Sequence, residues 1–319
     1  MSEPRIEPPF FTPRLRFSLL GHPVRHSVSP VMCAAAFASL GMPHVYTAID
    51  LPSAAGLARI AADLRSGVLA GCNVTVPYKR AVLEHADALA PTAEEAGAAN
   101  VLAVERGRVI AHNTDAEALA RDIDALWSGP PRHQAAIIGS GGAALAALVA
   151  CRRLGFRVVS MTSRSWINTE TVFEAPAAQR ARALGALTAP WPLPDEEAPA
   201  GKLSQALRLQ WSELVAQADC VIQATSAGML GGDPGDDVVR IVPWSGLPAH
   251  AVAYDVVYNP RLTAFLRAAR ARGLAATDGL GMLVRQAALS IEIWTGSAPP
   301  LDRMRQVAED ALAARQTGR

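Results

Sequence analysis

The residues with the clearest potential for chemistry are polar side chains at the end of an apolar stretch. Asn73 and Thr75 lie in the run NVTVPYK, two positions apart, so a strand would place both on one face. Lys79 follows closely enough to reach whatever they hold. A second polar cluster, HNTD at 112–115, ends in Asp115. Alone, these would be a surface lysine and a helix cap. Facing one cleft, they could handle a proton together, with the carboxylate orienting the ammonium.

A glycine-rich turn provides a second kind of site. Residues 137–144 read IIGSGGAA and lie between an apolar stretch and a helical one. Glycines at such a bend let the backbone approach a pyrophosphate, and the N–H groups of the helix N-terminus hold its charge. The spacing GxGGAA differs from the common GxGxxG, and a tight turn with a purely structural purpose is the alternative. The strand–turn–helix context favours dinucleotide binding.

The end of the next strand bears on which dinucleotide is bound. An NAD enzyme would usually place Asp or Glu on the ribose hydroxyls about 20 residues past the glycines. This chain has Ser163-Arg164-Ser165 there. A guanidinium can clamp a 2′-phosphate or stack on adenine, so the sequence favours NADP. The alternative is a solvated arginine at a strand end.

The elements that must position these groups alternate between strands and helices, which is typical of an α/β fold. Ser29 is a plausible N-cap for the first helix, since Pro30 suits a first helical position. Arg106-Gly107 should form the turn of a hairpin. For this part of the chain we expect strands at 16–21, 45–51, 71–76, 100–105 and 109–112, and helices at 30–40 and 78–89.

A new βαβ unit begins after a helix at 115–126 and the linker SGPP at 128–131. Its strands are almost wholly apolar, as parallel sheets covered on both faces require. Residues 163–217 are interrupted by five prolines, so we expect irregular loop around the two helical stretches in this region. We expect strands at 135–139, 157–162, 218–224 and 251–258, helices at 177–186 and 204–209, and two final helices, 282–295 and 301–314, that pack back on the first part.

Composition excludes several functional classes. The 319 residues are 50% hydrophobic and 18% charged, with a formal net charge of +1 and no basic run, so neither nucleic acid nor an anionic membrane is an expected partner. The polar, proline-rich start, residues 1–13, lacks the apolar core of a signal peptide. The longest apolar stretch, 143–151, is about half of what a bilayer span needs. We therefore expect a soluble cytoplasmic protein.

The four cysteines are isolated from one another, and none belongs to a CxxC or Cys/His cluster. Scattered single cysteines in a chain of this length usually fill cores in a reducing compartment. Cys72 adjoins the NVTVPYK run, so a reactive thiol there is the less favoured alternative. We expect no metal site.

Together these motifs resemble the shikimate dehydrogenase family, and they occur in that family's order. The match runs from about residue 16 to about residue 290, with a poor stretch between 166 and 217. The motifs are HSVSP at 26–30, NVTVPYK at 73–79, AGAAN at 96–100, NTD at 113–115, GSGGAA at 139–144, YDVVY at 254–258 and DGLGMLVRQA at 278–287.

The resemblance implies a two-domain α/β protein. Residues 1–114 with 279–319 would form an N-terminal α/β substrate-binding and catalytic domain. Residues 115–278 would form a Rossmann-type NADP-binding domain with a doubly wound parallel sheet. The implied activity is the reversible NADPH-dependent reduction of 3-dehydroshikimate to shikimate by a monomer or homodimer.

The resemblance also implies a role for individual residues. Lys79 and Asp115 would be the catalytic pair. Ser27 and Ser29 would bind the substrate carboxylate, and Tyr258 would lie near the nicotinamide and the substrate. The ring hydroxyls would be bound by Asn73, Thr75, Asn100 and Gln286. The NADP(H) cofactor would be bound by Gly139, Ser140, Gly141, Gly142, Ala143, Ser163, Arg164, Ser165, Thr225 and Gly279. No histidine base is implied, so His22, His26 and His112 are treated as structural.

Some positions depart from the family pattern and keep alternatives open. NADP-dependent members have Asn-Arg-Thr at 163–165 and a second arginine where this chain has Asn168, and the stretch 164–223 is expanded here. One alternative is therefore quinate, or dual quinate/shikimate, oxidation with NAD, although Ser29 and Val76 follow the shikimate pattern. The other is a non-catalytic ligand or nucleotide sensor, which the presence of both Lys79 and Asp115 disfavours.

Overall fold

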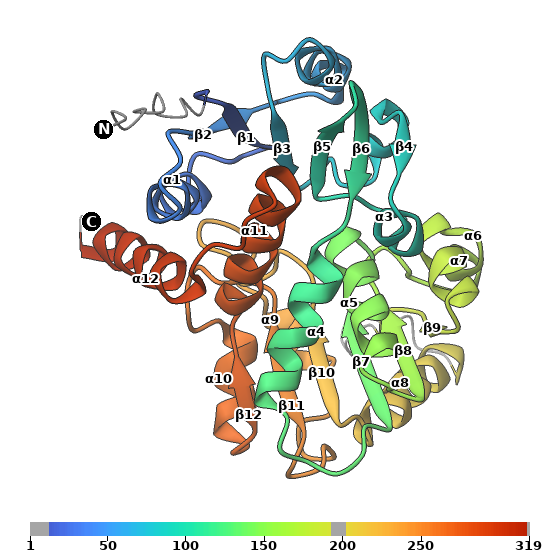
Figure 1. The fold of residues 1–319 in the computed structure, drawn as a ribbon. Coiled ribbons are helices and arrows are strands. Elements are labelled where there is room, and N and C mark those ends of the chain that lie inside the picture. Colours follow the sequence, from blue (N-terminus) through green and yellow to red (C-terminus); the bar gives the residue numbers. More distant parts are fainter. Residues whose placement is uncertain (1–12, 193–201, 318–319) are drawn as a thin grey trace, which may run out of the picture.

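The computed structural model describes residues 13–192 and 202–317. Residues 1–12, from whose polar character we expected no signal peptide, lie outside these ranges. So do Pro194 and Pro199, two of the five prolines in the 163–217 region. Two six-stranded sheets with flanking helices organise the described chain (Figure 1). The predicted α/β class with a Rossmann-type parallel sheet is confirmed.

The first sheet has the strand order β2-β1-β3-β5-β6-β4, and β5 is antiparallel to both of its neighbours. The other strand pairs are parallel, so the carboxyl ends of β1, β2 and β3 lie at the same edge of the sheet. The hairpin turn at Arg106-Gly107 is confirmed, and both residues have positive φ, 52° and 77°. The strands are β1 (Arg16–Gly21), β2 (Val45–Asp50), β3 (Gly71–Val74), β4 (Ala88–Leu89), β5 (Val101–Glu105) and β6 (Arg108–His112).

The helix expected at 78–89 is wrong. The chain there forms a turn, the short 3₁₀ helix η2 (Ala81–His85) and then β4. The N–H of Asp87 donates to the carbonyl of Val109 at 2.7 Å, and that of Ala90 donates to Ala111 at 2.9 Å. Pairing with β6 thus draws the segment into the sheet and overrides its local helix propensity.

The prediction that Ser29 caps the first helix is also wrong. Helix α1 (Ser29–Ser39) begins at that residue, and its N-cap is Val28, which makes no side-chain capping hydrogen bond. The backbone N–H of Ser29 is satisfied instead by the hydroxyl of Ser27, at 3.2 Å. The sequence did not predict η1 (Ala54–Gly56), α2 (Leu57–Arg65) or α3 (Pro91–Ala96).

The two final helices, α11 (Leu280–Thr295) and α12 (Leu301–Thr317), pack on the first part of the chain, as predicted. Phe17 and Phe37 share one buried core with Ile291 of α11 and Met304 of α12. Figure 1 shows α11, which packs in the core of the first sheet, running beside α4 (Asp115–Leu126), which packs on the second sheet, and the two helices contact each other. Helices from distant parts of the chain therefore fix the sheets relative to one another.

The second sheet is wholly parallel, with the order β12-β11-β10-β7-β8-β9. The chain starts at β7 in the middle and reverses direction to β10, which is the topological switch point of a doubly wound fold. The strands are β7 (Gln134–Ile138), β8 (Val158–Thr162), β9 (Leu187–Ala189), β10 (Cys220–Gln223), β11 (Val252–Asp255) and β12 (Ala275–Thr277).

The region that the sequence left unplaced adds an edge strand and helices to this sheet. The predicted helices at 177–186 and 204–209 correspond to α7 and to part of α8, whereas α6 and β9 were not predicted. The remaining helices are α5 (Gly142–Arg153), α6 (Thr169–Glu174), α7 (Pro176–Ala183), α8 (Lys202–Ala216), α9 (Asp236–Arg240) and α10 (Ala264–Ala271). Within the described ranges, no helix has both the length and the apolar character needed to cross a membrane.

Candidate active site

Lys79 and Asp115 form a buried ion pair. The distance from Lys79 Nζ to Asp115 Oδ2 is 2.6 Å, and the two side chains are only 14% and 3% exposed. Lys79 follows β3 and Asp115 is the first residue of α4, so the pair joins two elements 36 positions apart in the chain. A charge-assisted bond of this length, shielded from water, holds the ammonium in one place.

Lys79 is fixed by the turn that replaces the expected helix. The N–H of Tyr78 donates to the carbonyl of Thr75 at 3.0 Å, and the carbonyl of Lys79 accepts from the N–H of Ala99 at 2.7 Å. The lysine backbone is thus tied to the segment that leads into Asn100. Its position therefore depends on a contact between two loops rather than on a helix N-terminus.

Asp115 is oriented by its neighbours in the NTD motif and by Asn100. Asn100 Nδ2 donates to Asp115 Oδ1 at 2.9 Å, and the Asp115 N–H donates to Asn113 Oδ1 at 3.0 Å. Asn113 Nδ2 in turn donates to the carbonyl of Ala98, at 2.8 Å. Both oxygens of the carboxylate are engaged, so its plane is fixed.

Buried amides extend this network. Asn100 Nδ2 also lies 3.1 Å from Gln286 Oε1 of α11. Asn73, which is 4% exposed, donates through Nδ2 to the carbonyl of Asn100 and to Ser290 Oγ, and its Oδ1 accepts from the Tyr46 hydroxyl at 2.8 Å. Both amide hydrogens of Asn73 are therefore in use, and its oxygen retains one free lone pair.

The sequence did not single out Tyr46 or Ser290 as members of this network. Ser290 lies four residues after Gln286, so helical spacing places both on the same face of α11. That spacing was the available signal. No comparable local signal marks Tyr46. Thr75 follows β3, and its methyl group fills the space next to Gly21.

Ser27, Ser29 and Tyr258 form a separate polar group. Ser27 Oγ lies 3.1 Å from Ser29 Oγ. Burial raises the pKa of Tyr258, and Ser27 is close enough to lower it only in part, so the Tyr258 hydroxyl keeps its proton at neutral pH. Arg315 of α12, which the sequence did not suggest, donates to the carbonyl of Ser27 at 3.2 Å. In the described part of the chain, no hydrogen bond links this group directly to the Lys79–Asp115 pair.

The glycine-rich turn has the form that a pyrophosphate requires. Gly139 has φ +135°, and a Cβ built there would lie 2.7 Å from the carbonyl oxygen of Ala224, so only glycine fits. Gly141 is the N-cap of α5, which has no side-chain capping hydrogen bond, and Ala143 lies in its first turn. The N–H groups at the start of α5 are therefore available to an anion.

Three serines continue from this turn toward the end of β8. Ser140 Oγ lies 2.8 Å from Ser163 Oγ, which lies 3.1 Å from Ser165 Oγ. Arg164, between the last two, is 40% exposed and forms an ion pair with Asp233, a residue that the sequence did not suggest. The pair joins residues 69 positions apart, and no local pattern announces it.

Thr225 and Gly279 are the two remaining predicted cofactor residues. Thr225 follows β10, and Gly279 immediately precedes α11. Thr225 Oγ1 accepts from the N–H of Ala227 at 3.0 Å. A Cβ on Gly279 would lie 2.2 Å from the carbonyl oxygen of Val256, so the close approach of these backbones needs glycine. Both residues follow strands of the second sheet at its carboxyl edge.

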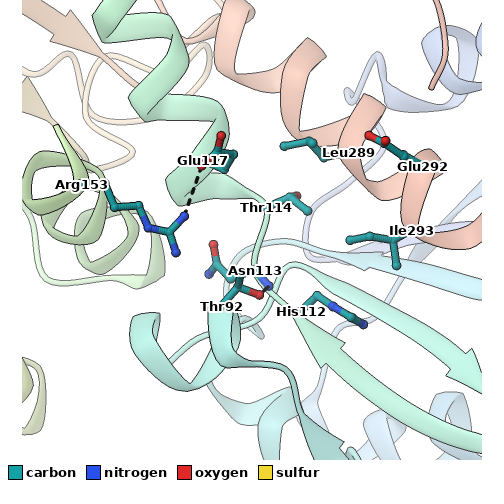
Figure 2. Close-up of a pocket in the computed structure, with 9 residues that line it drawn as sticks. All are labelled: Thr92, His112, Asn113, Thr114, Glu117, Arg153, Leu289, Glu292 and Ile293. Atoms are coloured by element: carbon teal, nitrogen blue, oxygen red, sulfur yellow. Dashed lines mark hydrogen bonds and ion pairs between the residues drawn. The ribbon is translucent and has the colours of Figure 1, made fainter. Parts of the chain in front are cut away.

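A cavity of about 300 Å³ lies beside the NTD motif but does not include the Lys79–Asp115 pair (Figure 2). Its lining combines polar, charged and apolar side chains, and Arg153 on one side of it pairs with Glu117 Oε2 at 3.3 Å. Burial lowers the pKa of His112 on its wall. Residues lining the cavity are Thr92, His112, Asn113, Thr114, Glu117, Arg153, Leu289, Glu292 and Ile293.

Neither a metal centre nor a reactive thiol emerges from the described residues. Within residues 13–192 and 202–317, no cluster of three or more His, Cys, Asp or Glu side chains could hold a metal ion. Burial raises the pKa of Cys72 to about 12, so this thiol stays protonated at neutral pH. A nucleophilic role for Cys72 is therefore disfavoured.

Comparison with known proteins gives consistent matches along the chain. The family model described as the shikimate dehydrogenase substrate binding domain matches residues 19–102, and the one described as the shikimate 5′-dehydrogenase C-terminal domain matches residues 279–309. The shikimate dehydrogenase (NADP(+)) of Symbiobacterium thermophilum is 36% identical over 294 residues, which cover 92% of this chain and 93% of that protein.

Solved structures agree with the sequence matches. The shikimate 5-dehydrogenase of Thermus thermophilus, in complex with NADP(H) and shikimate, is 32% identical and superposes with a TM-score of 0.74, covering 93% of this chain and 99% of that one. The quinate dehydrogenase of Corynebacterium glutamicum, in complex with NAD, is 25% identical with a TM-score of 0.75, covering 93% and 99%. The two-sheet arrangement is thus shared with a shikimate dehydrogenase and with a quinate dehydrogenase.

Proposed function

The chain belongs to the shikimate dehydrogenase family, and we propose that the Lys79–Asp115 pair is the proton-handling centre of its reaction. The protein is an NADP-dependent oxidoreductase that interconverts 3-dehydroshikimate and shikimate. The observation that carries the proposed site is the position of this buried pair directly against Gly142 of the glycine-rich turn. This contact brings the proposed proton donor and the cofactor-binding turn to the same place, which supports a role in carbonyl reduction by a nicotinamide cofactor.

The residues present fit the cofactor. The open space at Gly141, where a Cβ would meet no atom within 4 Å, and the uncapped start of α5 suit a pyrophosphate. When bound, NADPH supplies the hydride for the C3 carbonyl carbon of 3-dehydroshikimate. The adenosine half would be held by Ser163, Arg164, Ser165 and Thr225. Gly279 would allow its own backbone to pack closely against that of Val256 beside the site.

Lys79 would donate a proton from Nζ to the carbonyl oxygen as that oxygen becomes a hydroxyl, and would recover a proton from water. Asp115 would keep the ammonium aligned through its 2.6 Å contact, while Asn100 fixes the carboxylate at 2.9 Å. In shikimate oxidation the neutral amine would accept the hydroxyl proton. Both directions therefore use Lys79 in opposite protonation states, with Asp115 as its orienting partner.

The remaining polar residues would bind the substrate. Ser27 and Ser29 lie at the start of α1, where the helix N-terminus also favours a carboxylate. Thr75, Asn100 and Gln286 would bind ring hydroxyls. Because both hydrogens of Asn73 are already in use, Asn73 would contribute only as an acceptor. Tyr258, through its contact with Ser27, would lie between the carboxylate and the nicotinamide.

The division of the chain into a substrate domain, 1–114 with 279–319, and a cofactor domain, 115–278, remains part of the proposal. So do a cytoplasmic location and a monomeric or homodimeric state. The arrangement of one sheet before α4 and a second sheet after it supports this division.

Steady-state assays of the purified protein on shikimate and on quinate, each with NADP and with NAD, test the proposed function. We expect the highest kcat/KM with shikimate and NADP. A higher kcat/KM with quinate and NAD would establish the quinate alternative. Ligand binding without turnover of either acid would instead favour the sensor.

A further inference from the structure

Arg164 and Asp233 form an ion pair between two loops on either side of the glycine-rich turn. Arg164 follows β8, Asp233 lies in the loop between β10 and α9, and Arg164 Nη1 donates to Asp233 Oδ2. In the second sheet, β7 lies between β8 and β10. The pair therefore bridges the carboxyl end of β7 at the switch point, where a doubly wound fold binds its nucleotide.

Asp233 is held in place by its own loop. Its Oδ1 accepts from the N–H of Gly235 at 2.8 Å, and its carbonyl accepts from the N–H of Gly228 at 2.7 Å. The N–H of Gly235 and then the Arg164 guanidinium lower the pKa of Asp233, so it is ionised at neutral pH. The side chains of Arg164 and Asp233 are 40% and 37% exposed, so a ligand can reach both.

We propose that Asp233 is a specificity-determining residue that competes with the 2′-phosphate of NADP for Arg164 and so reduces the preference for NADP over NAD. The inference rests on the proposed function in placing the adenosine of the cofactor at this pair. A 2′-phosphate carries about −1.5 to −2 charges at pH 7. It must displace the carboxylate from Arg164 and then lie near a fixed negative charge.

NAD meets a different situation at the same pair. Its adenosine ribose has a 2′-hydroxyl, which can donate to the carboxylate without breaking the bond to Arg164. The acid that an NAD enzyme usually places after its second strand is replaced here by Arg164, but Asp233 brings a carboxylate to the same place from another loop. Arg164 therefore offers a partner to the 2′-phosphate of NADP, and Asp233 offers one to the 2′-hydroxyl of NAD.

The opposite role for Asp233 would be to hold Arg164 ready for the phosphate. The two roles can be separated by measuring how the full-length protein binds the adenosine half of each cofactor. Adenosine 2′,5′-bisphosphate represents NADP, and adenosine 5′-monophosphate represents NAD. The variant is Asp233→Asn, whose side-chain oxygen still accepts from the Gly235 N–H. The matched control is Asp237→Asn, which removes the same charge four residues away, from an exposed pair with Arg240 at 3.2 Å.

By isothermal titration calorimetry, we expect Asp233→Asn to bind the bisphosphate about 3- to 10-fold more tightly than wild type, as release of an exposed ion pair and loss of a nearby like charge suggest. Binding of the monophosphate should not tighten. Asp237→Asn should change either affinity by less than about twofold, because its charge is exposed and already paired with Arg240 rather than with Arg164.

Unchanged or weaker binding of the bisphosphate by Asp233→Asn would overturn the proposal, as would an equal gain for both nucleotides or an equal gain in the control. If the asparagine variant does not fold, Asp233→Ser provides the same test, since its hydroxyl can still accept a hydrogen bond. Neither probe requires turnover. A protein that binds the bisphosphate but does not oxidise shikimate would contradict the proposed function and leave this inference standing.

Discussion

Gly142 and Lys79 are in packing contact. A Cβ built on Gly142 would lie 3.1 Å from Lys79 Cβ and 3.2 Å from Lys79 Cδ. Gly142 begins α5, after the first strand of the second sheet, whereas Lys79 follows β3 of the first sheet. The absence of a side chain at Gly142 thus allows the proposed proton donor to lie directly beside the proposed cofactor turn.

Replacing Gly142 with alanine should therefore displace Lys79 from Asp115. The added Cβ requires Lys79 to move by a few tenths of an ångström. Since a shift of about 1 Å in a catalytic group can reduce the rate up to 10²-fold, we expect Gly142→Ala to lower kcat about 3- to 10-fold. The control is Gly141→Ala, because a Cβ at Gly141 meets no atom within 4 Å. Both variants add a methyl group to the turn and should raise KM for NADP. Equal kcat values for the two variants would show that the Gly142 contact does not position Lys79.

The sequence predicted the chemistry of the site better than the path of the chain through it. Lys79 and Asp115 were expected together, and they lie 2.6 Å apart. The helix expected to carry Lys79 does not form, because Asp87 and Ala90 bond to β6 instead. Strand pairing with a partner more than 20 residues away has no signature in local apolar spacing, which is why that segment was assigned wrongly.

The partners that orient the predicted residues were harder to find. Asn113 lies within a recognised motif, and its acceptance of hydrogen bonds from the N–H groups at the start of α4 could be anticipated from its residue type. Tyr46 and Asp233 contact Asn73 and Arg164 only because distant loops and strands meet. Such contacts depend on tertiary packing, to which residue type and spacing in one sequence give no access.

Arg164→Ala should weaken NADP binding far more than NAD binding. A hydrogen bond from a guanidinium to a charged group contributes about 1.5 to 3 kcal/mol. Because Asp233 already occupies Arg164 and the side chain is 40% exposed, we expect the lower end, or about a 10-fold rise in KM for NADP. KM for NAD should change less than about twofold under the same conditions. An equal loss for both cofactors would remove Arg164 from phosphate recognition.

Asp255 should make stability depend on pH. Burial raises the pKa of its carboxyl from 3.8 to about 7, outweighing the bonds from Thr263 and Val257. Between these values the native state holds a proton that the unfolded chain has lost, so the stabilisation present below pH 4 is lost as the pH rises through 7. Asp255→Asn cannot ionise and retains the acceptor for the Val257 N–H.

We therefore expect the Tm of wild type to fall relative to that of Asp255→Asn as the pH rises from 4 to 8. Each unit of pKa difference corresponds to about 1.4 kcal/mol, so the relative change in Tm should reach several degrees. Thermal unfolding followed by circular dichroism across this pH range measures it, and the exposed Asp237→Asn serves as the control. Parallel curves for wild type and Asp255→Asn would mean that Asp255 titrates alike in both states.

The proposed mechanism depends most directly on the Lys79–Asp115 pair. If Lys79 supplies the proton, Lys79→Ala should lower kcat by about 10² to 10⁴, the usual contribution of a positioned acid or base, while shikimate still binds. Asp115→Asn should also lower kcat, because the amide cannot hold the ammonium as the carboxylate does at 2.6 Å. Each single variant leaves a buried charge without its partner, so Tm must be measured to confirm that both remain folded.

The two residues should act as one unit. The double variant should therefore be little slower than the slower single variant, because removing either residue already disables proton transfer. Single-turnover rates for wild type, both single variants and the double variant complete this cycle. Losses that multiply would show that Lys79 and Asp115 contribute independently, and a Lys79→Ala protein with near-normal kcat would assign the proton transfer to another group. The fixed geometry of the pair, with Asn100 2.9 Å from the second carboxylate oxygen, favours the coupled outcome.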